Sequence, residues 1–364
     1  MERRTDILFP PLQLVAPYRL GRLILFPPLL FFLWPTGIAQ APPVRYEASH
    51  DAMGTVFTIV AYGRDARFLA QVANEAFDEI DSLDAQMSHY KVESEITRIN
   101  RRAAREPVLV EPRLFALLAE AVRYSQESDG AFDITVGPLM KAWGFFRGEG
   151  RVPPRAELAR VRQRVGYRHI LLGLSQRTIR FDVEGLELDL GGIAKGYAVD
   201  RAVEILRANG VSSALVSSGA SGIYALGAPP GERAWCITLR DPFEKGKAGD
   251  SIRLKNYSFA VSGTYEKFFE WKGRKYSHIL DPRTGRPVEG MLAAAVLAPR
   301  AVESDALSTT LFVMGTERSP VYLSSHPNLA VLFYKPGSGP RAFRRIHAQS
   351  AQFVLPPESV AEIE

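Results

Sequence analysis

Strand-like and helix-like hydrophobic patterns follow one another in an irregular order along this chain, and that order limits the folds open to it. Residues 53–63 (MGTVFTIVAYG) alternate apolar and polar side chains like a strand, whereas apolar side chains recur every three or four positions over residues 69–83 and again over 114–122, as on helices. Further strands are predicted at FAVSG, LAAAVLAP and NLAVLFYK. A clean parallel sheet needs a regular strand–helix repeat, so the sequence predicts an α+β (mixed α/β) fold.

One segment joins a strand pattern to a helix pattern through two adjacent glycines. The runs TIRFDV (residues 178–183) and LELDL (residues 186–190) are separated by a Glu-Gly pair, which predicts a hairpin. Helical spacing resumes over residues 199–206. We therefore expect Gly191 and Gly192 to form a turn from a strand into a helix.

The first 39 residues have the layout of a secretory signal peptide. Arginines precede the apolar run LILFPPLLFFLW (residues 23–34), and small residues follow it. Cleavage after Ala39 would start the mature chain at Gln40. The alternative is a retained membrane anchor, but a proline-interrupted run of this length falls short of the roughly 20 residues that span a bilayer.

The predicted organisation is therefore a signal peptide, residues 1–39, followed by one domain, residues 40–364. No cysteine lies in the leader, which excludes lipid attachment there. We expect an exported, periplasmic protein, associated with the membrane only if the leader is retained.

Composition excludes several functional classes. The formal net charge of +5 falls to +3 when the leader, with four arginines, one glutamate and one aspartate, is removed (5 − 4 + 2). The remaining basic residues are spread along the chain without a recognised motif, so no nucleic acid partner is expected. The single cysteine, Cys236, excludes an intramolecular disulfide and a multi-cysteine metal site. Its apolar surroundings, AWCITL, predict a small core residue.

The glycine turn is a candidate anion site. Backbone N–H groups at a helix N-terminus point outward, and glycine lets a phosphate approach them closely. Lys195 would add a positive charge. No Ser or Thr follows the lysine, so the turn has no hydroxyl to hold Mg²⁺ as a P-loop does. The alternative is that Gly191 and Gly192 only form the turn while Lys195 faces solvent.

Two further groups of residues have side chains suited to metal binding or to proton transfer. Asp305 and Thr309 are four positions apart, so on a helix their oxygens share one face, and hard oxygen ligands suit Mg²⁺. The alternative is Asp305 or Ser304 as a helix N-cap with Thr309 packed inward.

In HILDPRTG, His278 stands beside a tight turn and could transfer a proton near neutral pH. The alternative is a histidine hydrogen-bonded under a loop. No HExxH motif is present, which argues against a zinc enzyme.

Taken together, these segments resemble the ApbE-type FAD:protein FMN transferases. The likeness covers Met53 to Gly315 and rests on seven segments in order: MGT, SHYKVESEITRIN, SDGAFDITVGPL, DLGGIAKGYAVD, AVSGTYEKF, HILDPRTGRPV and SDALSTTLFVMG. The resemblance implies an ApbE-like, T-fold-like fold with two interlocked α/β subdomains and the active site between them. It also implies a Mg²⁺-dependent enzyme that takes FAD as substrate, transfers FMN to a Thr or Ser hydroxyl of an exported flavoprotein acceptor, and releases AMP.

The resemblance assigns roles to particular residues. FAD contacts are expected at Met53, Tyr90, Ala131, Phe132, Asp133, Asp189, Lys195 and Ile279. The expected metal ligands are the Gly192 carbonyl, Asp305 and Thr309. The catalytic candidates are His278, as the proton acceptor, and Asp305.

The sequence departs from the family pattern at two places. Ala220 and Ser221 replace the second glycine and the acid of a Gly-Gly-Asp turn, and Val261 replaces the threonine of Thr-Ser-Gly. Two other functions stay open: an FAD pyrophosphatase that gives FMN and AMP, and a non-catalytic periplasmic FAD-binding protein. An enzyme of this kind would be peripheral to membrane acceptor complexes at most.

Overall fold

The computed structural model describes residues 42–363 except 147, 220–221, 241–247 and 340–341. Residues Pro43–Glu364 form one compact unit. The predicted signal peptide and its cleavage site lie outside the described residues, as do Ala220 and Ser221. Among the residues that are described, no helix is both long and apolar enough to cross a membrane.

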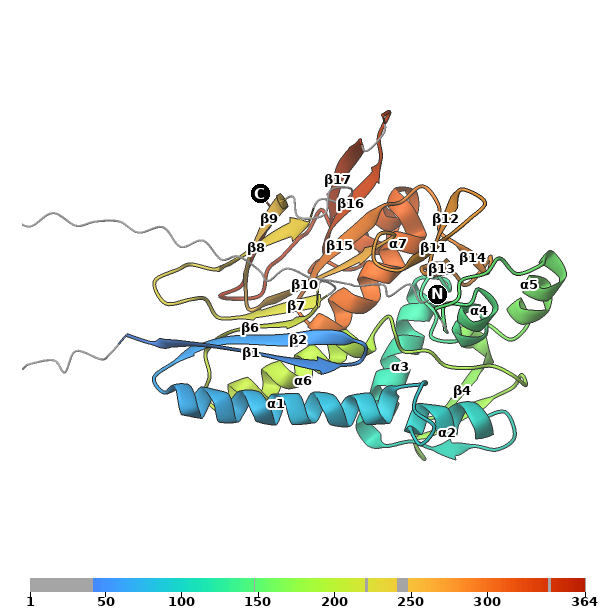
Figure 1. The fold of residues 1–364 in the computed structure, drawn as a ribbon, viewed down its shortest axis with the longest axis horizontal. Coiled ribbons are helices and arrows are strands. Elements are labelled where there is room, and N and C mark those ends of the chain that lie inside the picture. The colour runs from blue at the N-terminus through green and yellow to red at the C-terminus, as the bar shows by residue number, and fades with distance from the viewer. Residues whose placement is uncertain (1–41, 147, 220–221, 241–247, 340–341, 364) are drawn as a thin grey trace, which may run out of the picture. The chain divides into compact units, whose positions relative to one another are not determined.

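The centre of this unit is an eight-stranded sheet in which every neighbouring pair is antiparallel (Figure 1). The mixed α/β prediction is confirmed, and the predicted strands FAVSG, LAAAVLAP and NLAVLFYK belong to this sheet. In spatial order its strands are β1 (Val44–Ala52), β2 (Thr55–Gly63), β6 (Ser213–Ser218), β7 (Gly222–Leu226), β10 (Tyr257–Gly263), β15 (Ala293–Ala298), β16 (Ala330–Pro336) and β17 (Phe343–Gln349).

Three long helices cover one face of the sheet: α1 (Ala66–Met87), α6 (Ala194–Ala208) and α7 (Ala301–Ser324). A small sheet of β8 (Trp235–Arg240), β9 (Ala248–Lys255) and β18 (Val360–Ile363) packs on the other. Because both faces are covered, strands such as β15 (AAAVLA) are apolar throughout and fully buried. The predicted apolar face of α1 is buried, which confirms the helix inferred from its spacing.

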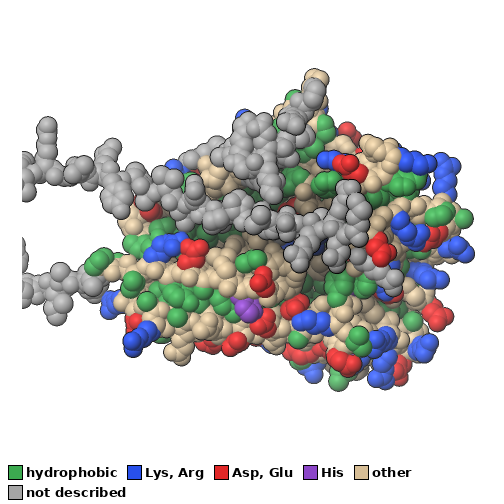
Figure 2. Space-filling model, viewed as in Figure 1, with side chains coloured by type: hydrophobic (Ala, Val, Ile, Leu, Met, Phe, Trp, Pro, Cys, Tyr) green, Lys and Arg blue, Asp and Glu red, His purple; other side chains and the backbone are tan. Residues whose placement is uncertain are grey.

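Shorter elements extend this unit beside the sheet. The helices are α2 (Glu95–Arg102), α3 (Pro112–Glu127), α4 (Gly137–Ala142), α5 (Arg155–Arg162) and the 3-10 turn η1 (Tyr167–His169). The strands are β3 (Val108–Leu109), β4 (Ile170–Gly173), β5 (Thr178–Phe181), β11 (Phe268–Trp271), β12 (Arg274–Ser277), β13 (Leu280–Asp281) and β14 (Arg286–Pro287). On the face seen in Figure 2, basic side chains are interspersed with acidic and apolar ones among the described residues.

The predicted hairpin of TIRFDV with LELDL is wrong. Strand β5 pairs with β4 and β3 instead. The backbone of LELDL is bound elsewhere: the Asn100 side chain accepts from Leu188 N–H at 2.7 Å and donates to its carbonyl at 3.1 Å, and Asp189 N–H donates to the Ile134 carbonyl at 2.7 Å. These partners are distant in sequence, so local spacing could not identify them.

The prediction that Cys236 is a core residue is also wrong, because its side chain is exposed. Strand β8 alternates: Trp235 and Ile237 face the core, and Cys236 between them faces solvent.

Candidate active site

The glycine turn directly precedes α6, as predicted, and charged side chains on both sides hold it. Asp189 Oδ1 accepts the Gly191 N–H at 2.8 Å, and Lys195 Nζ donates to the Gly191 carbonyl at 2.8 Å. The Lys195 side chain is 21% exposed, so it does not simply face solvent. Its ammonium lies 4.0 Å from Asp305 Oδ1. The turn is therefore tied to the helix that carries Asp305.

Helices α6 and α7 touch where Gly196 meets Asp305. The Gly196 N–H donates to Asp305 Oδ2 at 2.9 Å. A Cβ at Gly196 would lie 2.2 Å from the Ala301 carbonyl and 2.6 Å from Asp305 Cβ, so only glycine permits this approach. Asp305 is 5% exposed, and this contact fixes its carboxylate next to the turn.

Thr309 lies one helical turn beyond Asp305, beside Gly192. A Cβ built on Gly192 would be 3.7 Å from Thr309 Oγ1. The hydroxyl of Ser262, on β10, lies 3.0 Å from Thr309 Oγ1 and 2.8 Å from Ser308 Oγ. The structure thus brings together the three residues expected to hold a metal, and it adds Ser262, which the sequence did not single out.

The donors at this place fit Mg²⁺. No group of three or more His, Cys, Asp or Glu side chains that could hold a metal occurs in the described part of the chain. Asp305, Thr309 and the Gly192 carbonyl instead offer one carboxylate, one hydroxyl and one carbonyl, all hard oxygens. Magnesium is commonly bound by one or two carboxylates together with waters and substrate phosphates, so a sparse protein site of this kind suits it.

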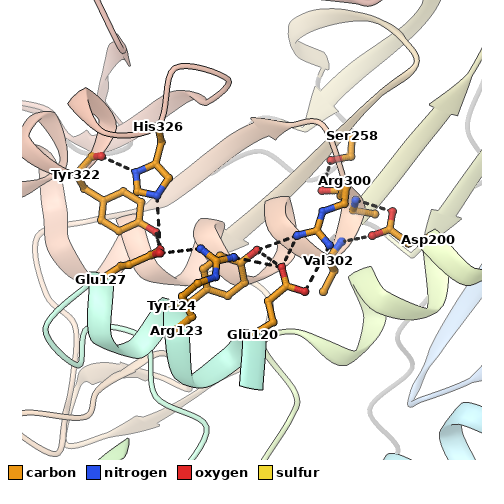
Figure 3. A network of polar contacts seen from close by, with 11 residues as sticks. Glu120, Arg123, Tyr124, Glu127, Asp200, Ser258, Arg300, Val302, Tyr322 and His326 are labelled. Carbon is orange, nitrogen blue, oxygen red and sulfur yellow. Dashed lines mark hydrogen bonds and ion pairs between the residues drawn. The ribbon is translucent and has the colours of Figure 1, made fainter. Parts of the chain in front are cut away.

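A polar network fixes the start of α7 (Figure 3). Asp200, on α6, accepts the N–H groups of Ala301 and Val302 at 2.7 and 2.9 Å, and Arg300 pairs with Glu120 on α3. The helix begins at Ala301. The alternative in which Asp305 or Ser304 caps this helix is therefore wrong. Burial raises the pKa of Asp200 to about 6.

His278 follows strand β12 and is partly buried. Its Nδ1 lies 2.9 Å from the Lys267 carbonyl, which requires a proton on Nδ1 and leaves the lone pair on Nε2 of the neutral ring. Burial lowers the pKa of His278 to about 4, with contributions from the charges of Lys267 and Lys195. The imidazole is therefore neutral near pH 7, and the same lowered pKa makes it a weaker base than an ordinary histidine.

The remaining predicted FAD contacts occupy different surroundings. Met53 has a φ of 50° in the two-residue turn between β1 and β2. Phe132 lies beside the glycine turn, since a Cβ built on Gly192 would be 3.3 Å from Phe132 Cε2. Ala131 and Ile279 are buried. Asp133 accepts bonds from Thr135 and from Tyr167 N–H, so its carboxylate is engaged within the protein, and burial raises its pKa.

A pocket of ≈ 320 Å³ opens beside the turn, and Tyr90 and Asp189 both line it. Tyr90 is 60% exposed, so much of its side chain is accessible to solvent. Its ring packs against two others: His89, with ring centroids 4.1 Å apart, and Phe146, with ring centroids 4.6 Å apart and planes 21° apart. Phe146, Asp200 and Ser262 were missed because their roles depend on contacts between distant segments.

Comparison with known proteins identifies the family of this chain. The profile of the ApbE family matches residues 53–333. A protein of Treponema pallidum named FAD:protein FMN transferase is 32% identical over 331 residues, covering 85% of this chain and 91% of the relative. One of the same name from Escherichia coli K12 is 29% identical over 315 residues, with 82% and 88% covered.

Solved structures of this family share the fold. The ApbE protein of Thermotoga maritima superposes with a TM-score of 0.76 at 31% identity, covering 85% of this chain and 98% of that one. The flavin transferase ApbE of Vibrio cholerae gives a TM-score of 0.74 at 29% identity, covering 86% and 99%. With most of its length matched by the family profile, the chain belongs to the ApbE family.

Proposed function

We propose that this protein is a Mg²⁺-dependent FAD:protein FMN transferase, which moves the FMN part of FAD to a Thr or Ser hydroxyl of an acceptor protein and releases AMP. The observation that carries the proposal is the convergence of the Gly192 turn, Asp305 and Thr309 beside a pocket with an exposed aromatic ring. Relatives named FAD:protein FMN transferase support the same activity.

The proposed reaction is one displacement at phosphorus. The acceptor hydroxyl oxygen forms a bond to the phosphorus that bears riboflavin, and the bond from that phosphorus to the bridging oxygen breaks. AMP takes the bridging oxygen with its electron pair. Mg²⁺, held by Asp305, Thr309 and the Gly192 carbonyl, would neutralise charge on the phosphate oxygens.

The protein's own residues would position the substrate and remove the proton from the acceptor hydroxyl. Asp189 and Lys195 hold the glycine turn from both sides, so its conformation is fixed before substrate arrives. The proton of the acceptor hydroxyl would pass to Nε2 of His278, because Nδ1 is already bound to the Lys267 carbonyl. Asp305 is held by Gly196, which keeps the carboxylate from turning away.

We also propose that the protein acts after export, with the mature chain starting at Gln40 and an exported flavoprotein as acceptor. The leader sequence supports this proposal. Nothing in the proposal requires a nucleic acid partner.

One experiment tests the activity and separates it from its two alternatives. The mature protein is incubated with FAD, Mg²⁺ and a purified FMN-binding acceptor domain, and the products are analysed by mass spectrometry and chromatography. Transfer gives an acceptor heavier by one FMN and an equal amount of AMP. AMP and free FMN without acceptor labelling would indicate the pyrophosphatase. Bound, unchanged FAD would indicate a binding protein, and either result would overturn the proposal.

Parallel reactions with chelator, and with Asp305→Asn, test the metal. Both should lower AMP release by roughly a hundredfold or more. Full activity in the presence of chelator would overturn the Mg²⁺ assignment while leaving the transfer itself intact.

A further inference from the structure

Strands β11 and β12 form a two-stranded sheet of their own, so each has an edge that pairs with no other strand in the described part of the chain (Figure 1). One face of this hairpin is anchored. The rings of Phe269 and Tyr276 stack with centroids 5.2 Å apart, and Phe269 contacts Phe145 at 5.4 Å. The Phe145 ring in turn lies 6.4 Å from the ring of His278. The hairpin is therefore packed against the residue proposed as proton acceptor.

The register of the hairpin shows which backbone groups point outward. In an antiparallel pair of strands, hydrogen-bonded and non-hydrogen-bonded residue pairs alternate. The His278 N–H donates to the Lys267 carbonyl at 3.1 Å, so these two residues form a hydrogen-bonded pair. Phe268 and Glu270, one and three residues further along the chain, therefore belong to non-hydrogen-bonded pairs. Their N–H and C=O groups point away from β12.

These outward groups of β11 have no partner in the described part of the chain. No hydrogen bond there joins the backbone N–H or C=O of Phe268 or Glu270 to another group. Phe268 is 42% exposed, and Glu270 is exposed as well. Natural sheets usually protect their edges, because a row of unpaired N–H and C=O groups is a template for another strand. Strand β11 thus offers two donors and two acceptors to an extended peptide.

The outer edge of β12 is less open. Lys275 is exposed, but Ser277 is buried, and its hydroxyl accepts the Ile279 N–H at 3.2 Å. The chain then continues into β13, which pairs with β14. An incoming segment therefore finds the longer exposed edge on β11.

The proposed reaction already requires a protein partner near this edge. The group that receives FMN is a hydroxyl of another protein, and that hydroxyl must reach His278. Lys267, directly before β11, holds the imidazole through its carbonyl, which lies 2.9 Å from Nδ1. A segment paired along β11 would leave the edge beside Lys267, so the residues next to it in the acceptor would enter the site. Side chains of both charge signs, Lys267 and Glu270 among them, occur here, so backbone complementarity rather than charge defines the partner.

We propose that β11 is the docking strand for the acceptor protein: an extended segment of the acceptor pairs with the backbone of Phe268 and Glu270, and the adjoining residues present the hydroxyl to His278. The inference rests on the proposed function, since it takes the acceptor of FMN as the partner. In such strand addition, main-chain hydrogen bonds supply the affinity. The exposed rings of Phe268 and Trp271 would also suit a lipid surface, but unpaired edge groups are costly in hydrocarbon, which favours the protein partner.

The test compares two proline substitutions that lie opposite each other in the hairpin. Glu270→Pro removes an N–H from the edge of β11, and Lys275→Pro removes one from the edge of β12. Neither N–H is bonded within the hairpin, and both changes remove the same ion pair of 3.7 Å. In FMN transfer with FAD and Mg²⁺, Glu270→Pro should raise the KM for the acceptor by roughly 3- to 10-fold, the effect of one hydrogen bond, with kcat unchanged. Lys275→Pro should leave both constants unchanged.

Two controls separate docking from damage to the fold. Glu270→Ala keeps the N–H and loses the same side chain, so it should match wild type. The FAD affinity, measured by calorimetry, and the unfolding midpoint should be the same in all three variants.

Amide hydrogen exchange gives a second readout on the wild-type protein. In the presence of an acceptor that lacks the modified hydroxyl, the N–H groups of Phe268 and Glu270 should exchange more slowly. The N–H of Lys275, on the opposite edge, should exchange at its original rate.

Three results would overturn docking at β11. The first is an unchanged acceptor KM in Glu270→Pro, and the second is an equal loss in both proline variants, which would indicate a distorted hairpin. The third is binding to phosphatidylglycerol vesicles that Trp271→Ser weakens, without slower amide exchange when acceptor is added, which would assign the hairpin to a membrane. A wild-type protein that transfers no FMN would instead overturn the proposed function, so the two failures are distinguishable.

Discussion

Asp305 Oδ2 accepts the backbone N–H of Gly196 at 2.9 Å, across the contact between α7 and α6. One carboxylate oxygen thus joins two helices, while the other lies 4.0 Å from Lys195 Nζ, on the side of the glycine turn. The residue expected to bind the metal is also the residue that sets the position of the turn.

We expect Asp305→Asn to lower FMN transfer by roughly a hundredfold or more, as loss of a main electrostatic stabiliser does, while the amide oxygen can still accept the Gly196 N–H. Initial rates at saturating Mg²⁺ measure the effect, and the unfolding midpoint checks the fold. Glu303→Gln, on the same helix, is the control and should retain activity. Near-normal transfer by Asp305→Asn would refute its role at the metal.

Gly196→Ala should destabilise the protein by roughly 1–3 kcal/mol, the usual cost of overpacking, because the new Cβ would meet the Ala301 carbonyl. In an unobstructed helix the same substitution stabilises by about 1 kcal/mol. Urea unfolding gives the sign. A more stable variant with full activity would show that the two helices can separate at no cost.

Asp200→Asn should alter how stability depends on pH. The pKa of Asp200 is raised to about 6 by burial, so the folded state holds its proton more tightly than the unfolded state. Its contribution to stability therefore declines as pH rises from its unfolded pKa of about 3.9 toward 6, and is constant above that. The wild-type minus variant difference in unfolding free energy should fall over this window. A flat difference would contradict a raised pKa.

His278 should be neutral, and able to accept a proton, at pH values well below those of an ordinary histidine, because its pKa is lowered to about 4. The acid limb of kcat/KM should therefore lie near pH 4 rather than near 6.5. The lowered pKa of His278 also affects stability. The neutral ring contributes its full share to the unfolding free energy above the unfolded-state pKa of about 6.5, and that contribution is lost as pH falls toward 4.

We further expect His278→Ala to bind FAD normally while transfer falls by roughly a hundredfold or more. Calorimetry and single-turnover rates separate the two effects. Transfer that survives this change would mean that water or another carboxylate takes the proton.

Ser262→Ala should weaken Mg²⁺ binding without unfolding the protein. The hydroxyl of Ser262 contacts Thr309 Oγ1 and Ser308 Oγ, so its loss frees Thr309 to rotate. Such partners of ligand side chains typically contribute about 10-fold or more to metal affinity. Titration of activity with Mg²⁺ would detect the shift, and an unchanged titration curve would show that Thr309 is held by its helix alone.

The sequence determined the local structure wherever one face of an element is buried along its whole length. The apolar spacing of α1 and α3 identified the helices and their buried faces, and the two glycines before α6 identified the turn, because a helix start and a tight bend depend on neighbouring residues. The ordered motifs also identified the family.

Tertiary structure decided what depends on partners distant in sequence. The backbone of LELDL is bound by Asn100 and by residues 134–137, so this run does not form the hairpin that its spacing indicated. Helix α7 starts at Ala301 because Asp200, from another helix, caps it. Glycine at position 196 lets α6 and α7 approach closely enough for Asp305 to reach the turn. Hydrogen bonds and close packing between separate segments have no period in the sequence, and only the folded chain brings these groups together.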